Sequence, residues 1–169
     1  MGSPMASMQQ LFVGLAALVA AVSVVAPSAS AFEVSPPDIG RDAGQRIFVH
    51  GETVSATVLG ASGGFDNRLT LDGLSEDDGI ACGSVPVGFT SLIGEFDAPT
   101  EMVMTLTTPE DNVWTTGPGA DSPDAVPHAR LTILGDDRVL MEWEDLSGGG
   151  DGDYNDCVVE LLITPNAAP

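Results

Sequence analysis

A thirteen-residue acidic segment, residues 144–156, concentrates the side chains that bind hard metal ions. It holds five carboxylates and one carboxamide, with three consecutive glycines in the middle. Crowded carboxylates repel one another, so a bound cation would stabilise them. Calcium takes six to eight oxygen ligands from carboxylates, carboxamides and backbone carbonyls. The segment therefore predicts a Ca2+ site. An ordinary acidic loop, solvated and empty, is the alternative, because aspartate and glycine favour loops anyway.

The spacing of these residues favours a calcium loop that is not an EF-hand. Asp151, Asp153 and Asn155 stand at positions i, i+2 and i+4, a spacing that opens many calcium loops. An EF-hand has glycine at its sixth position and glutamate at its twelfth, whereas Asp156 and Leu162 stand there. The flanking residues are β-branched or large and apolar, so we expect a loop between two strands. The predicted metal ligands are Glu144, Asp145, Asp151, Asp153, Asn155 and Asp156.

A second loop supplies two further candidate groups. Asp124 and His128 lie in a stretch rich in glycine and proline, residues 117–128. They serve the turns of that loop, or they approach the acidic segment across the end of the sheet and support its ligands. The two tryptophans, Trp114 and Trp143, fit core positions better than ligand platforms.

The elements that must position these residues have the pattern of short β-strands. No segment after residue 31 keeps a helical period over ten residues, and residues 102–107 show the period-two alternation of a half-buried strand. About nine short strands at this spacing predict an all-β fold, an antiparallel β-sandwich of jelly-roll or immunoglobulin-like topology. The predicted strands are residues 46–50, 53–59, 67–71, 85–89, 102–107, 113–115, 129–134, 139–143 and 157–163.

The N-terminal segment predicts export. Residues 11–26 are apolar apart from Ser23, and small residues precede Phe32, so residues 1–31 read as a signal peptide cleaved after Ala31. The first ten residues lack the usual positive charge. A retained membrane anchor is the alternative, although the apolar stretch is shorter than the roughly 20 residues that span a bilayer. We expect one domain over residues 32–163, a loose tail over residues 164–169, and a secreted or cell-surface location.

Charge and composition narrow the classes of function. All 25 acidic residues follow residue 31, the only basic residues besides histidine are five arginines, and the net charge is −20. Such a charge argues against nucleic acid as a partner. Cys82 and Cys157 are the only cysteines, and in an exported chain we expect them to form a disulfide, with buried free thiols as the alternative. No common catalytic motif is present, so we expect no enzyme; a hydrolase using aspartate or glutamate is the weaker option.

The acidic segment resembles a known signature. Residues 144–156 are similar to the C-terminal motif E-D-L-x-G-G-G-D-x-D-[FY]-N-D of a bacterial exported family of domains of unknown function. Members of that family occur in cell-surface and PEP-CTERM-type anchored proteins. Residues 65–71 and 114–129 are similar to its upstream segments, so the resemblance covers about residues 53–163. It implies a calcium-stabilised, β-rich extracellular module and supplies no enzyme activity.

Three departures from that family affect the second loop and the final strand. Ser122 and Ala125 stand where the family has asparagine and glycine, and Cys157 replaces an apolar residue.

We expect a secreted calcium-binding β-sandwich with a structural or adhesive role, whose partner is a surface protein, a polysaccharide or a second copy of itself. The alternative is a calcium-dependent carbohydrate-binding module in which Trp114 or Tyr154 stacks on a sugar.

Overall fold

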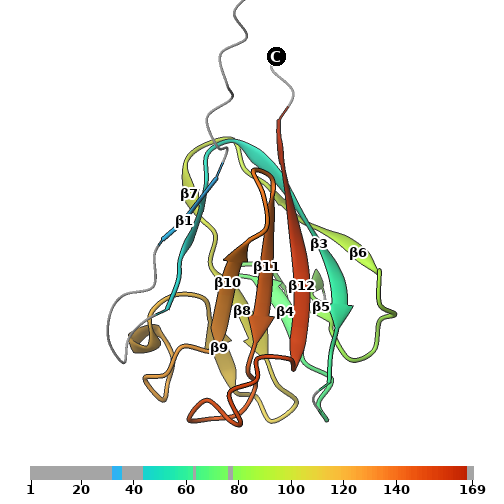
Figure 1. Cartoon of the computed structure of the whole chain (residues 1–169), viewed down its shortest axis with the longest axis vertical. Helices are drawn as coiled ribbons and strands as arrows, with labels where there is room; N and C mark the ends of the chain where they lie inside the picture. Colours follow the sequence, from blue (N-terminus) through green and yellow to red (C-terminus); the bar gives the residue numbers. More distant parts are fainter. Residues whose placement is uncertain (1–31, 36–43, 63, 76–77, 167–169) are drawn as a thin grey trace, which may run out of the picture.

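Figure 1 shows the computed structural model of the chain, which describes residues 32–35, 44–62, 64–75 and 78–166. The predicted signal peptide lies outside the described residues. Within the described residues, no helix has the length and apolarity needed to cross a membrane.

The described residues form twelve strands in three antiparallel sheets. The largest sheet has the order β10 (Ala129–Ile133), β11 (Arg138–Trp143), β12 (Cys157–Pro165), β3 (Glu52–Gly60) and β6 (Thr90–Glu95). The second has the order β5 (Ile80–Ala81), β4 (Arg68–Leu71), β8 (Met104–Thr107) and β9 (Val113–Thr115). The smallest joins β1 (Phe32–Val34), β2 (Ile47–Val49) and β7 (Thr100–Glu101).

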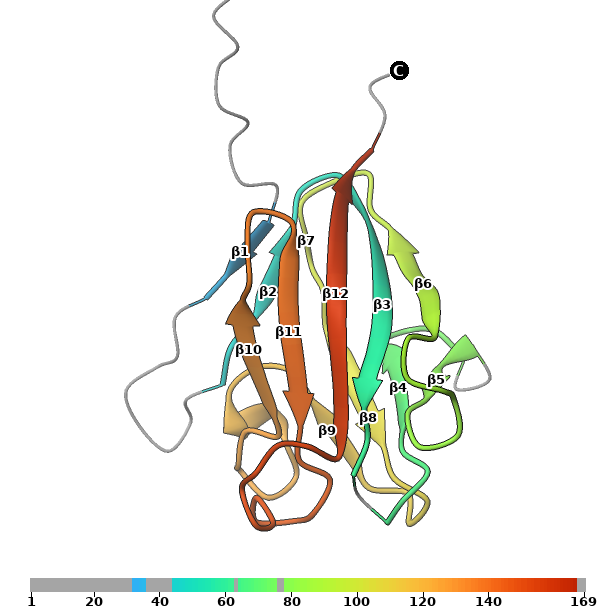
Figure 2. The same ribbon diagram turned by 45° about the vertical axis from the view of Figure 1, so that its right-hand side comes forward.

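The five-stranded and four-stranded sheets lie face to face, with the first in front in Figure 2. Alternate residues of each strand point between them: β3 buries Val54, Ala56 and Val58, while β8 buries Met104 and Leu106. These side chains belong to a single hydrophobic core. The period-two pattern therefore produces the predicted all-β sandwich, because one face of each strand must leave water.

The number of strands differs from the prediction of about nine. Residues 85–89, predicted as a strand, form turns instead. Pro86 has no N–H to donate to a sheet ladder, and Gly88 adopts a φ of 88°, so this apolar run cannot extend. The strand in this part of the chain is β6, which begins after the turns. It lies at the edge of its sheet, and most of its residues are exposed or polar, so its sequence lacks a clear apolar pattern.

The predicted loose tail is wrong for its first three residues. Thr164 and Pro165 extend β12, so the strand continues past residue 163. Asn166 is tied to the neighbouring turns, since its N–H donates to Gly51 O at 3.1 Å and its Nδ2 donates to Phe96 O at 3.0 Å. Residues 167–169 lie outside the described residues.

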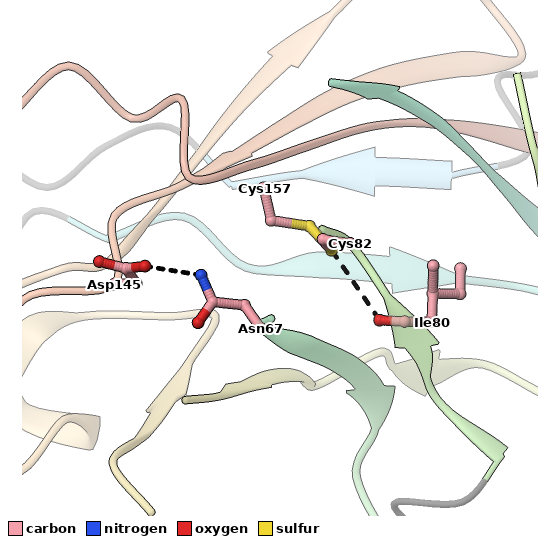
Figure 3. Close-up of a disulfide and its surroundings, with 5 residues drawn as sticks. All are labelled: Asn67, Ile80, Cys82, Asp145 and Cys157. Atoms are coloured by element: carbon pink, nitrogen blue, oxygen red, sulfur yellow. Dashed lines mark hydrogen bonds between the residues drawn. A yellow bond between two sulfur atoms is a disulfide. The ribbon is translucent and has the colours of Figure 1, made fainter. Parts of the chain in front are cut away.

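A disulfide between Cys82 and Cys157 joins the two large sheets (Figure 3). Cys82 directly follows β5, and Cys157 is the first residue of β12. The bond closes a loop with a sequence separation of 75 residues. The predicted pairing is confirmed, and the bond anchors β12 at the residue directly after the acidic segment.

Candidate metal centre

The acidic segment connects β11 to β12 at one end of the sandwich, opposite the end that β12 reaches at Pro165 (Figure 2). Trp143 and Cys157 face each other in the antiparallel ladder, and Asp156 N donates to Trp143 O at 3.1 Å. Residues just after β11 are therefore held beside residues just before β12. The end of the ladder places Glu144 beside Asp156, and Asp145 N donates a hydrogen bond to Asp156 Oδ2 at 2.9 Å.

Glycines let the connecting loop fold back over these residues. Gly148, Gly149, Gly150 and Gly152 all have positive φ, a conformation that glycine adopts at little cost. At Gly150 a Cβ atom would lie 1.9 Å from Glu144 Oε1, so this position also needs the space that glycine leaves. The glycines thus bring the second half of the loop against the Glu144 carboxylate.

The carboxylates converge in two groups of three that share Glu144. The inner group is Glu144, Asp145 and Asp156; the outer group is Glu144, Asp151 and Asp153. In each group, one oxygen from each residue lies within 4.8 Å of the others. Glu144 and Asp145 are only 1% and 3% exposed, whereas Asp151 and Asp153 are exposed. Both groups offer the oxygen ligands that a hard cation prefers.

Hydrogen bonds within the loop orient the outer carboxylates and place the sixth predicted ligand. Asp153 N donates to Asp151 Oδ1 at 3.2 Å, and Asn155 N donates to Asp153 Oδ1 at 3.0 Å. The Asn155 amide also donates to the Asp153 carboxylate. Asn155 therefore adjoins the outer group through Asp153. Its backbone carbonyl accepts a hydrogen bond from Ser62 N at 3.0 Å.

The inner carboxylates lie in an environment that disfavours their charge. Burial raises the pKa of Glu144, and the nearby charge of Asp156 raises it further. Burial also raises the pKa of Asp145, and the Asn67 hydrogen bond only partly offsets it. None of the ion pairs among the described residues involves a carboxylate of either group. A cation bound between these carboxylates would offset the cost of their charge.

The second loop supports the backbone of the acidic segment. His128 is fully buried, with Nδ1 2.8 Å from Glu144 O, and Glu144 N donates to His128 O at 2.9 Å. Asp124 Oδ2 lies 3.0 Å from His128 Nε2 and accepts a hydrogen bond from Gly148 N at 2.6 Å. Burial raises the pKa of Asp124, but these contacts and the Val126 N–H lower it more, so the net shift is downward. Asp124 and His128 thus hold the loop by hydrogen bonds to its backbone.

Trp114 and Asn67 also hold the acidic segment in place, and the sequence analysis did not identify Asn67. Trp114 stacks on His128, with ring centroids 3.8 Å apart, and its Nε1 donates to Asp145 O at 2.8 Å. Asn67 is fully buried, and its Nδ2 donates to Asp145 Oδ2 at 2.6 Å (Figure 3). Asn67 lies just before β4, within the segment that resembles the exported family, and that position is the only signal for it in the sequence.

Tyr154 joins the acidic segment to β10. Its hydroxyl donates to Pro127 O at 3.1 Å, and the Arg130 guanidinium lies 4.8 Å from its ring centroid. Its φ of 58° is rare for a residue with a side chain. An open pocket of about 400 Å³ lies beside the ring, lined also by Gln45 and Leu131.

Replacing Gly150 with alanine should weaken metal binding by about 10–100-fold, the range seen when groups that orient ligands are altered. The new methyl group would displace the Glu144 carboxylate, which belongs to both groups. Calcium titration by calorimetry measures the effect. Gly148→Ala is the matched control, because Gly148 also has positive φ but a Cβ there would meet nothing within 4 Å. Equal losses in the two variants would show that backbone strain, and not the displaced carboxylate, is responsible.

No family model, curated protein or solved structure matches the chain. The resemblance to the exported family therefore stays a prediction.

Proposed function

We propose that this domain is an exported calcium-binding β-sandwich module in which the ion fixes one end of the sandwich, serving a structural or adhesive role outside the cell. The observation that carries the proposal is the convergence of five carboxylates in two groups that share the buried Glu144. Export is supported by the apolar segment at residues 11–26 and agrees with the disulfide.

The donor set favours calcium over other common metal ions. Zinc sites in proteins are built around cysteine sulfur and histidine nitrogen, with carboxylate oxygen as an additional ligand in some of them. Here Cys157 is in the disulfide, and both ring nitrogens of His128 face oxygen atoms of Glu144 and Asp124. Magnesium needs a near-ideal octahedron and gives up water reluctantly. A flexible loop of carboxylates and glycines fits the larger and less regular calcium shell better.

A bound ion would connect parts of the chain that are far apart in sequence. Asp145 contacts Asn67 beside β4 and Trp114 in β9, both in the four-stranded sheet. Glu144 contacts His128 through its backbone, and Asp156 precedes the disulfide at Cys157. The ion therefore stabilises the junction of the two sheets, which supports a structural role.

The carbohydrate-binding alternative is weaker on this geometry. Trp114 is 2% exposed and stacked on His128, so it offers no face to a sugar. Tyr154 carries Arg130 over its ring, and its hydroxyl is engaged with Pro127. Trp114 is therefore closed to a sugar, whereas Tyr154 lines the open pocket but has one face of its ring covered by Arg130.

Calcium titration of the chelator-stripped protein by calorimetry tests the proposal. We expect saturable binding in wild type and a loss of affinity of at least about 100-fold in Glu144→Gln. The loss should exceed that caused by removing a residue that only hydrogen-bonds to a ligand, because Glu144 would be a ligand itself. Asp136→Ala is the control, because Asp136 is an exposed acid in the β10–β11 turn. Absence of binding in wild type, or equal affinities in the two variants, would refute the assignment.

A further inference from the structure

The outer face of the five-stranded sheet carries exposed leucines. It faces the reader in Figure 2, and no other element of the described residues lies over it. Strand pairing sets Leu92 of β6 beside Ser55 of β3, and Ser55 beside Leu162 of β12, so these three residues form one row across the face. Leu92 is 57% exposed and Leu162 is 40% exposed. Further apolar residues at outward positions are Leu59, Leu140 and Val158.

The charges on this face nearly cancel. The five strands carry two of the five arginines of the chain, but only three exposed or half-buried acidic residues out of 25. Arg130 Nη2 lies 2.9 Å from Glu142 Oε1 on the neighbouring strand. Arg138 Nη1 lies 3.8 Å from Glu160 Oε2 in the same way, which leaves Glu95 as the third acid. The face is therefore close to neutral, although the net charge of the chain is −20.

A nearly neutral face is the surface through which two copies of this chain can meet. Two molecules with a net charge of −20 repel one another when acidic surfaces approach. A two-fold contact places the same patch of both copies together. On this face such a contact brings arginines and glutamates in nearly equal number, while the leucines supply apolar area. A basic partner would instead be attracted to the acidic surfaces and would meet two arginines here, so charge favours a second copy.

The size of the face suits a dimer that dissociates on dilution. Its strands have five to nine residues. At about 3.4 Å per residue and about 4.8 Å between strands, the five strands cover about 600 Å². Two such faces would bury about 1,200 Å², the lower end of the range for stable, specific interfaces.

We propose that two copies of this domain stack through the outer faces of their five-stranded sheets, with Leu92 and Leu162 buried in the contact. The acidic segment lies at one end of the sandwich, beyond this face (Figure 2). The inference therefore goes beyond the proposed calcium binding and does not depend on it. Salt should strengthen the dimer, because it screens the repulsion between the two acidic molecules.

Sedimentation of the exported protein in chelator, over a wide range of protein concentration and at low and high salt, tests the inference. We expect a dimer that forms as the concentration rises and that high salt favours. A monomer under all these conditions would overturn the inference and leave the face to a different partner. A dimer that appears only with calcium would also overturn it, because ions would then bridge the acidic segments.

Matched variants assign the contact to this face. Leu92→Glu and Leu162→Glu should each weaken the dimer by at least about 100-fold, because every dimer would hold two added like charges in an apolar contact. Leu74→Glu is the control, since Leu74 is 49% exposed but follows β4 in the other sheet. It should form the dimer as wild type does, and circular dichroism checks the fold of each variant. An unchanged dimer in Leu162→Glu, or an equal loss in Leu74→Glu, would overturn the assignment.

Discussion

Calcium at a hundredfold excess over its dissociation constant should raise the free energy of unfolding of this domain by about 2.7 kcal/mol for each ion bound. The empty loop holds five carboxylates near one another, two of them almost fully buried, and the ion neutralises their repulsion only in the folded state. Thermal unfolding in calcium and in chelator measures the effect. At roughly 4 °C per kcal/mol for a domain of this size, the melting temperature should differ by about 10 °C or more.

Two comparisons make this result specific to the acidic segment. Magnesium at the same concentration should raise the melting temperature much less, because it demands a tight octahedron. Glu144→Gln should lose most of the calcium effect, since Glu144 belongs to both groups, whereas Asp136→Ala should keep it. If wild type unfolds at the same temperature in calcium and in chelator, the segment is an acidic loop without a structural ion.

The candidate ligands could be predicted from the sequence because they are local. The segment is contiguous and its glycines predict a tight loop. The flanking strands pair so that Trp143 faces Cys157. Any antiparallel hairpin would bring Glu144 near Asp156 in this way. The division into an inner and an outer group could not be predicted, since it depends on how the loop folds over the end of the sheet.

The supporting residues depend on tertiary contacts and were harder to find. Asn67 and Trp114 come from the opposite sheet and reach Asp145 only because the two sheets pack face to face. For His128 the sequence left open a turn role or an approach to the acidic segment, and its hydrogen-bond distance to Glu144 O decides for the latter. The residue types Asn, Trp and His do not by themselves indicate that a side chain supports a metal site, so the sequence could not predict these contacts.

The same reasoning explains the fold. Strands with a buried face, such as β3, β8, β11 and β12, carry the alternation that made them predictable. Four strands were missed: β1, β5 and β7 have only two or three residues, too few to establish a period, and β6 is an edge strand with mostly exposed residues. The apolar run at residues 85–89 misled because its hydrophobicity resembles a strand while Pro86 and Gly88 impose turns.

Removal of the disulfide should lower the free energy of unfolding by about 2–5 kcal/mol, the usual range for a native disulfide in a small secreted domain. The bond joins residues separated by 75 positions, so its loss frees a long loop in the unfolded chain. It also joins the two large sheets at the start of β12. Urea unfolding of the Cys82→Ala, Cys157→Ala double variant, compared with wild type at saturating calcium, measures the cost.

The alanine substitutions also leave space in the core, because both cysteines are buried. Wild type reduced with a thiol keeps its side chains and loses only the bond, so it separates the cross-link from the packing. Cys157 follows Asp156 directly, so loss of the bond should loosen an inner carboxylate. Calcium should therefore bind more weakly both to the double variant and to the reduced wild type. A loss of less than about 0.5 kcal/mol in the free energy of unfolding of the reduced wild type would mean that the two sheets are held together without the bond. An unchanged calcium affinity would mean that the acidic segment does not depend on the bond.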